Sequence, residues 1–322
     1  MSKKTIAIAM GGYSGEYDVS MGSGQVVYDH LSPHFVCYKV IIAKKGWHAE
    51  VGDEQFPINK HDFSFTDKEN NTITFDGVFV AVHGTPAEDG LLPAYFELIG
   101  MPHSTSNAFA SALTFNKAEC NMVIRNMGIT VPESVYIHQN DSVNAEDIVE
   151  KLGLPLFVKP NCSGSSLGVS KVKSASGFEQ ALKTAFAEDD AVVVESAVIG
   201  TEVACGVCKR EDKISALAIT EIVPKNEFFD YESKYSGLSE EITPARISEK
   251  AKLTIMAQTK LVYEKLKLNG LARVDFIIDH NDVPHLIEVN TVPGLSAESI
   301  LPKQAKFLDI DLGTLFAQSL PL

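Results

Sequence analysis

The sequence predicts a protein of several α/β and α+β domains. A chain of 322 residues is long enough for two or three domains with cores of their own. The first hundred residues alternate strand and helix patterns, which is typical of an α/β unit, whereas short strands follow one another in pairs after Leu154. We expect domains at residues 1–104, 105–196 and 197–322.

Composition and charge exclude several classes of protein. The chain has 45% hydrophobic and 22% charged residues, as ordinary globular proteins do, so disorder is not indicated. A net charge of -14 argues against nucleic acid or an anionic membrane as a partner. No apolar run is long enough for a secretory signal or a membrane span, and we expect a cytoplasmic protein.

The N-terminal segment predicts a strand, a glycine-rich turn and a helix. Residues 4–10 form a buried strand pattern, GGYSGEYDVSMGSG follows, and the helical pattern runs through residues 25–31. Such a turn aims backbone N–H groups at an anion, but no G-x-G-x-x-G is present. Glu16 in the turn would repel a pyrophosphate and suits a ligand with an ammonium group instead. A capped tight turn without a ligand stays open as an alternative.

The next two segments carry one candidate side chain each. The strand pattern over residues 72–84 ends in His83, and open α/β sheets bind ligands at the carboxyl ends of strands. A helical pattern then runs from residue 108 to residue 127 and carries Lys117, before Gly128 and Pro132 stop it. Neither side chain alone indicates a function, because a single histidine or helix lysine is more often structural.

A small-residue loop lies between two predicted strands. The strand LPLFVKP ends near Lys159, the loop NCSGSSLG follows, and VSKVKS continues as a strand. This is neither a P-loop nor a Rossmann turn, yet its backbone N–H groups could cover a triphosphate that Lys159 also reaches. A mobile surface turn is the alternative. The long polar and aromatic segment 225–245 has no clean period and suits a lid.

Residues 271–294 predict a hairpin with a polar face. A turn centred on Asn281 and Asp282 would set Asp275 opposite Glu288 and Arg273 opposite Asn290. Facing carboxylates repel unless a cation lies between them, and with an amide oxygen they suit Mg²⁺. An ordinary hairpin with a wet polar face remains possible on this stretch alone.

The five cysteines do not predict a disulfide framework. Cys205 and Cys208 resemble half of a zinc or redox motif, but they lie on a strand pattern at an odd separation. We therefore expect their thiols on opposite faces, with no metal or redox role.

Together these motifs identify the chain as similar to the D-alanine–D-alanine ligases of the ATP-grasp superfamily, over essentially its whole length. The resemblance is carried by GGYSGEYDVS, HGTPAEDG, VKPNCSGSSLGVSKV, FFDYESKY, ARVDF and EVNTVPGLSAESILP. It implies an ATP-grasp fold behind an N-terminal α/β domain. It also implies ligation of two D-alanine molecules for peptidoglycan precursors, through a D-alanyl phosphate made with ATP.

The resemblance implies roles for individual residues. Asp275, Glu288 and Asn290 would hold two Mg²⁺ ions, with Mn²⁺ as a substitute, and Arg273 with the Gly294 backbone would stabilise the oxyanion. Contacts to ATP would come from Lys117, Lys159, Ser163, Ser165, Ser166, Leu167, Glu195, Glu202 and Lys234.

The amino-acid substrates would be held by a separate group of side chains. Glu16 would bind the first ammonium group beside His83, and Ser165 and Tyr235 would link Glu16 to the lid. Ser299 and Ile300 would lie at the second D-alanine. The family also suggests a homodimer.

The chain departs from the common family pattern in places. Ser196 follows Glu195 where a lysine is frequent, and Cys162-Ser163 replaces Arg-Glu. Leu295 and Ile300 replace Met and Leu. Lys234 and Tyr235 favour D-alanine as second substrate, whereas D-lactate or D-serine remains the alternative. A nucleotide-binding module without catalysis is a further alternative.

Overall fold

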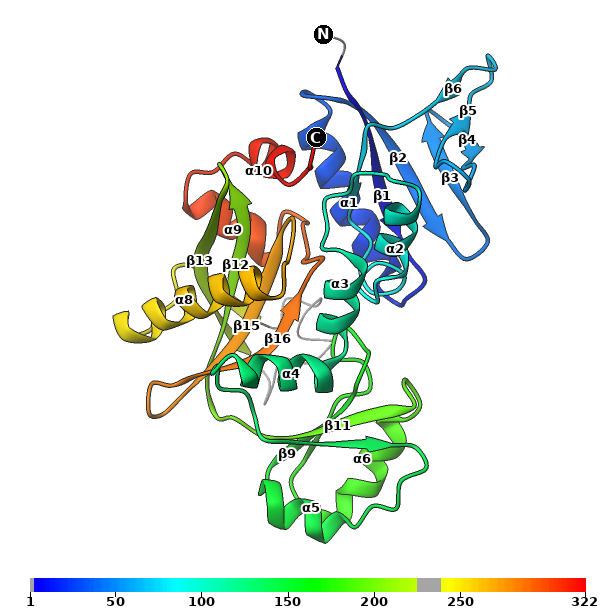
Figure 1. The fold of residues 1–322 in the computed structure, drawn as a ribbon. Helices are drawn as coiled ribbons and strands as arrows, with labels where there is room; N and C mark the ends of the chain where they lie inside the picture. The colour runs from blue at the N-terminus through cyan, green and yellow to red at the C-terminus, as the bar shows by residue number, and fades with distance from the viewer. Residues whose placement is uncertain (1–2, 225–238) are drawn as a thin grey trace.

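Three sheets of four or five strands and one two-stranded sheet organise the part of the chain that the structure describes, residues 3–224 and 239–322 of a computed structural model. Figure 1 shows the N-terminal unit beside the C-terminal sheet, with the central unit below both. The first and third units share a core to which helices α1 (Tyr17–Leu31), α9 (Ile300–Phe307) and α10 (Leu312–Gln318) contribute.

The N-terminal sheet has the strand order β4-β3-β2-β1-β7. Strand β1 lies between β2 and β7 and is parallel to both, and its residues 6–10 are buried on both faces, as the apolar run predicts. The elements are β1 (Thr5–Gly11), α1 (Tyr17–Leu31), β2 (Val36–Ala43), β3 (Gly46–Val51), β4 (Glu54–Pro57), β5 (Phe65–Thr66), β6 (Thr72–Ile73), β7 (Gly77–Val80) and α2 (Leu91–Leu98).

Helix α1 begins earlier than the sequence predicts. It starts at Tyr17, so the turn is short and most of the predicted glycine-rich loop is helical. The prediction failed because Gly24 is not a turn residue: a Cβ there would lie 2.6 Å from the Met10 Cβ, so glycine lets the helix approach β1 closely.

The prediction of a single strand over residues 72–84 is also wrong, since β6 and β7 are separate and His83 follows the end of β7.

The central sheet has the order β10-β9-β11-β8, with helices α5 and α6 contributing to its core. Strands β9 and β10 are antiparallel neighbours, which confirms that the small-residue loop 161–169 joins two strands. The elements are β8 (Ser134–His138), α5 (Ala145–Leu152), β9 (Leu156–Pro160), β10 (Ser170–Val172), η1 (Ala175–Gly177), α6 (Phe178–Ala185) and β11 (Ala191–Ser196).

The C-terminal sheet has the order β14-β13-β12-β15-β16 and helices on both faces. Cys205 packs in the same core cluster as α8, and Cys208 packs in the cluster that contains α9 and α10. The prediction that the two thiols face opposite ways is therefore confirmed. The elements are β12 (Gly200–Arg210), β13 (Lys213–Pro224), β14 (Ser239–Ile242), α8 (Glu249–Lys265), β15 (Ala272–Asp279), β16 (Pro284–Asn290), α9 (Ile300–Phe307) and α10 (Leu312–Gln318).

The helical stretch expected over residues 108–127 is two helices, α3 (Ala108–Phe115) and α4 (Lys117–Asn126). Asn116 breaks it, because its backbone is extended and its side chain caps α4 by accepting from Glu119 N–H. Lys117 is therefore the first residue of a helix. Ala110, Cys120 and Ile124 pack into the core of the C-terminal sheet.

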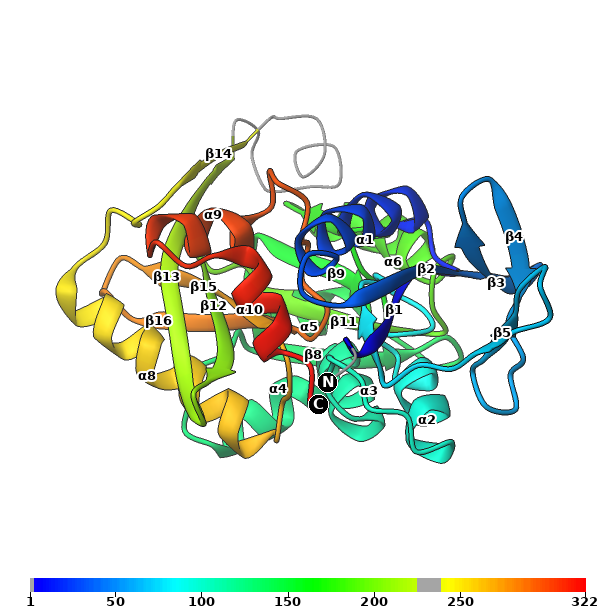
Figure 2. The same cartoon turned by 90° about the horizontal axis from the view of Figure 1, so that it is seen from above.

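A second core joins the two ends of the chain. Helix α10 packs on α1, and Phe316 contacts the ring of Phe79 on β7 with centroids 5.5 Å apart. Figure 2 shows α10 beside α1, and the C-terminal Leu322 reaches the start of β7, because a Cβ added to Gly77 would lie 2.8 Å from Leu322 Cδ2. Among the described residues, no helix has both the length and the apolar character to cross a membrane.

Candidate active site

The β15–β16 hairpin pairs Asp275 with Glu288 and Arg273 with Asn290, as the sequence predicts. The route to this register differs from the prediction. Residues 276–278 pair one position out of the expected register, because Asp282 takes a left-handed φ of 62° in a three-residue turn. A bulge at Ile287 then restores the register at the polar pairs.

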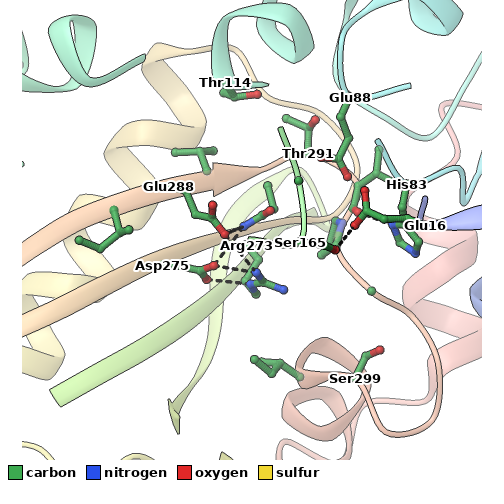
Figure 3. A pocket seen from close by; sticks show the side chains of 18 of the residues that line it. Glu16, His83, Glu88, Thr114, Ser165, Arg273, Asp275, Glu288, Thr291 and Ser299 are labelled. Carbon is green, nitrogen blue, oxygen red and sulfur yellow. Dashed lines mark hydrogen bonds and ion pairs between the residues drawn. The ribbon is translucent and has the colours of Figure 1, made fainter. Parts of the chain in front are cut away.

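The four polar side chains of this hairpin lie on one face and contact one another. Arg273 Nε donates to Asp275 Oδ1 over 2.7 Å, and its second nitrogen donates to Asp275 Oδ2 over 2.6 Å. Asn290 Nδ2 donates to the same Asp275 Oδ2 and, at 3.4 Å, to Glu288 Oε1. Figure 3 shows Asp275, Glu288 and Arg273 close together, and all three line one cavity. The polar face is therefore an organised cluster of charged side chains and not an ordinary solvent-exposed surface.

The charge on Arg273 is held firmly. Burial alone would lower the pKa of its guanidinium, but the Asp275 and Glu288 carboxylates outweigh burial and raise that pKa above its ordinary value. The arginine therefore remains a cation beside the two acids.

The two carboxylates and the Asn290 amide of the hairpin are hard donors of the kind that Mg²⁺ binds. No cluster of three or more His, Cys, Asp or Glu suitable for a metal is found within residues 3–224 and 239–322, so Asn290 would have to complete this set.

Glu16 lies opposite this hairpin and contacts the small-residue loop. Its carboxylate accepts a short hydrogen bond from Ser165 Oγ, across 149 residues of sequence. Gly164 makes this approach possible, because a Cβ there would lie 2.8 Å from Glu16 Oε2. Ser165 and Ser166 both take left-handed backbone angles, which sharpens the loop at this point. The loop therefore closes onto the N-terminal turn.

His83 lies beside Glu16 and is buried (Figure 3). Its Nδ1 is 2.9 Å from the Val292 carbonyl, which can only accept, so Nδ1 carries a proton. Burial lowers the pKa of the imidazole more than the nearby Glu16 charge raises it. The ring is therefore neutral at physiological pH, with Nε2 as an acceptor.

Two lysines approach the loop from different elements. Lys117 Nζ donates to the Ser163 carbonyl over 2.6 Å, and burial lowers the pKa of its amine. Lys159 forms a 2.6 Å ion pair with Glu195, whose buried carboxylate also accepts from Asn121 over 3.0 Å. Glu195 thus orients Lys159 in this structure. Ser196, which follows it, donates to the Leu152 carbonyl over 2.9 Å.

Two adjoining cavities, of about 360 Å³ and about 450 Å³, contain nearly all of the predicted residues. The smaller is lined by Glu16, His83, Arg273, Asp275, Asn290, Gly294, Ser299 and Ile300, and the larger by Lys159, Ser166, Leu167 and Glu195. Lys117, Ser163, Ser165, Glu202 and Glu288 line both. A ligand with two parts could therefore extend from one cavity into the other. The predicted lid residues Lys234 and Tyr235 lie outside the described residues.

Comparison with known proteins identifies the family. Residues 5–106 match the family described as D-ala D-ala ligase N-terminus, and residues 123–320 match D-ala D-ala ligase C-terminus. A D-alanine–D-alanine ligase from Flavobacterium johnsoniae is 48% identical over 99% of both chains, and one from Christiangramia forsetii is 48% identical over 99% and 98%. The chain belongs to the D-alanine–D-alanine ligase family.

Solved structures agree with this family and with its ATP-grasp fold. A D-alanyl-alanine synthetase A from Vibrio cholerae has a TM-score of 0.90 at 27% identity, with 99% of this chain and 98% of that chain covered. A D-Ala:D-Ser ligase from Enterococcus faecalis has a TM-score of 0.88 at 30% identity, with the same coverage. The sequence resemblance to this family is confirmed.

Glu88 is a cavity residue that the sequence motifs did not predict. It lies among Glu16, His83 and Thr291 in the smaller cavity (Figure 3). Burial, and next the charge of Glu16, raise the pKa of the Glu88 carboxyl to about 8. It is therefore protonated at neutral pH and can donate a hydrogen bond. The sequence signal was its place in TPAEDG after His83, but only the fold brings it to Glu16.

Proposed function

We propose that this chain joins two D-alanine molecules into D-alanyl-D-alanine at the expense of ATP. The observation that carries the proposal is the pair of adjoining cavities, bordered by Lys117, Ser165 and Glu288, in a member of this family. The larger cavity would hold the nucleotide and the smaller one the two amino acids. The γ-phosphate would then lie at the border, beside the first substrate's carboxylate.

The first step makes a D-alanyl phosphate. The carboxylate of the first D-alanine attacks the γ-phosphorus, and ADP leaves with the electrons of the broken bond. Glu16 holds the ammonium group of this substrate, while Lys117 and Lys159 offset phosphate charge. Loop residues Ser163, Ser166 and Leu167 cover the phosphates, and Glu195 and Glu202 lie toward the adenosine.

Asp275, Glu288 and Asn290 are the residues that would hold two Mg²⁺ ions, or Mn²⁺ in their place. Their oxygens fit a hard cation that takes its remaining ligands from phosphate and water. Bound there, the ions would offset the negative charge of the triphosphate.

The second step forms the peptide bond. The neutral amine of the second D-alanine, whose carboxylate is held by Ser299 next to Ile300, attacks the carbonyl carbon of the acyl phosphate. Arg273 and the Gly294 N–H stabilise the oxyanion, and phosphate leaves. Water must be excluded because it would hydrolyse the acyl phosphate. Lys234 and Tyr235 would take part by closing a lid. We also propose a cytoplasmic homodimer, as the family resemblance suggests.

A product assay tests this function. Purified protein with ATP, Mg²⁺ and D-alanine should release ADP and form D-alanyl-D-alanine, as detected by mass spectrometry. Release of no ADP would contradict ligation and favour a nucleotide-binding module. D-serine and D-lactate compete in the same assay, because the D-Ala:D-Ser ligase shares this fold at a TM-score of 0.88. A mixed product in excess over D-alanyl-D-alanine would replace the proposed second substrate.

A further inference from the structure

The loop Val292–Leu295, which follows β16, is held at both ends by side chains of the N-terminal unit. At one end, His83 Nδ1 lies 2.9 Å from the Val292 carbonyl. At the other end, the Leu295 N–H lies 3.2 Å from Ser23 Oγ. Ser23 Oγ and His83 Nε2 are themselves 2.8 Å apart. One hydroxyl on α1 therefore connects both ends of a loop that is 272 residues away in sequence.

The direction of each bond follows from the chemistry of its atoms. The Val292 carbonyl can only accept, which places the imidazole proton on Nδ1. Because the ring is neutral, Nε2 accepts, and the Ser23 hydroxyl must donate to it. Ser23 Oγ then accepts from the Leu295 N–H. The result is a continuous chain of three hydrogen bonds. The two side chains in it, Ser23 and His83, are both buried.

The two residues between these anchors, Pro293 and Gly294, line the smaller cavity. Pro293 has a fixed φ and no N–H, so Gly294 offers the first backbone donor after the Val292 anchor. An oxyanion donor acts only if it is held in place before charge develops. The anchors at Val292 and Leu295 supply that restraint from outside the loop.

We propose that Ser23 is a positioning residue for peptide-bond formation, acting through His83 and the Leu295 N–H on the Gly294 N–H. The proposal rests on the ligation proposed above. In the step concerned, the amine nitrogen forms the C–N bond and passes one proton to the departing phosphate. The C–O bond to phosphate breaks, and phosphate leaves with its electron pair. Ser23 is not required for acyl phosphate formation, which occurs at the border with the nucleotide cavity.

Ser20 provides a matched control on the same helix. It is also buried, and its hydroxyl also donates once and accepts once: it donates to the Ala81 carbonyl over 2.7 Å and accepts from the Gly11 N–H over 2.8 Å. Both partners belong to the N-terminal unit. A purely structural role for Ser23 would make Ser20→Ala and Ser23→Ala equivalent.

The test measures ADP and D-alanyl-D-alanine separately, with ATP, Mg²⁺ and saturating D-alanine. In Ser23→Ala, attack of the amine on the acyl phosphate should be slower, so that more of the acyl phosphate is hydrolysed by water. Dipeptide formation should therefore fall by about 10- to 100-fold, as for other misplaced catalytic groups. The ratio of ADP to dipeptide should rise above one, and added hydroxylamine should trap the difference as D-alanyl hydroxamate.

The control outcomes separate the possible failures. Ser20→Ala should lose thermal stability yet keep a ratio of one. If Ser23→Ala does not fold, Ser23→Cys, which keeps the side-chain shape with a weak donor, should show the raised ratio. A ratio of one in the folded Ser23 variant, or an equal rise in Ser20→Ala, would overturn the proposal. Wild-type protein that makes no dipeptide would instead refute the proposed function.

Discussion

The β15–β16 hairpin and the contacts of Glu16 hold their side chains in different ways. In the hairpin, Arg273, Asp275, Glu288 and Asn290 lie within 18 residues of sequence, and strand register sets them together. Glu16 meets Ser165 only because the loop of the central unit reaches the N-terminal turn. The hairpin is a preformed charge cluster, whereas the Glu16 contact depends on how separate units pack. Changes in the first should damage the chemistry, and changes in the second should damage the assembly of the site.

Asp275→Asn should have the largest effect, because it removes a charge from the hairpin. We expect turnover to fall by about 10³-fold, at the upper end for a single electrostatic group. The partly buried Arg273 also loses a charged acceptor, so the fold should persist with an unfolding free energy lower by about 1–3 kcal/mol. ADP release and thermal unfolding by circular dichroism measure the two effects.

Asp279→Asn is the control for that variant. Asp279 is on the same strand, but it accepts from the N–H groups of Asn281 and Val283 in the turn, away from both cavities. It should lose stability and keep its activity. Near-normal activity in Asp275→Asn would contradict a role for the hairpin acids.

Arg273→Lys should have the next largest effect. Lysine keeps the positive charge but cannot bridge both oxygens of Asp275 as the guanidinium does. The cation would then be poorly placed, and we expect kcat to fall by about 10²-fold. Steady-state kinetics with D-alanine measure it. Unchanged kcat would show that the geometry of this pair is unimportant.

A double-mutant cycle of Glu16→Gln and Ser165→Ala tests the contact between units. Each change should raise the KM for D-alanine, and the two effects should fail to add, with a coupling of about 0.5–3 kcal/mol. Non-additivity is expected because either change breaks the same hydrogen bond. Purely additive effects would mean that the two residues act separately.

Glu88→Gln should produce a smaller effect that depends on pH. The pKa of Glu88 is raised to about 8 in the folded protein, above its ordinary 4.5, so the folded state binds more protons between these pH values. Wild-type stability from this group therefore falls as pH rises from about 4.5 to 8. Glutamine carries no such proton, and the variant should gain thermal stability relative to wild type at pH 8.5 compared with pH 5. An equal difference at both pH values would contradict the raised pKa.

Cys162→Ser should have the smallest effect. The residue is exposed in the loop, but partial desolvation of its thiol, and next the Asp189 carboxylate, raise the thiol pKa to about 11, so the thiol is protonated at neutral pH and contributes no charge. Stability and kcat should stay close to wild type, with a change in unfolding free energy within about 0.5 kcal/mol. A tenfold loss of activity would show that the sulfur contacts a substrate.

The sequence predicted the hairpin site well because its information is local. Alternation of side chains along two short strands puts Asp275 and Glu288 on one face whatever the rest of the chain does. Even here the predicted pairing is correct only because two unpredicted shifts in register cancel each other. The three-residue turn shifts the register, and the bulge at Ile287 returns it. Neither feature has a sequence signal strong enough to be recognised alone.

Contacts between distant segments could not be predicted in this way. Gly24 was predicted to lie in a turn because glycine is common there. Its actual role is to let α1 pack closely against Met10 of β1, and a single sequence does not reveal that contact. Glu195 was expected to contact ATP, a role that remains a prediction, but its ion pair with Lys159 follows from the pairing of β9 and β11. Ser23 and Glu88 acquire their neighbours only through tertiary packing.

The fate of the carboxylate oxygen decides whether the reaction passes through an acyl phosphate. With D-alanine labelled with ¹⁸O in its carboxylate, wild-type protein, ATP and Mg²⁺, we expect one ¹⁸O atom in the released phosphate for each dipeptide formed. Mass spectrometry of the phosphate measures it. Phosphate without label, released together with dipeptide, would contradict an acyl phosphate at the border between the two cavities.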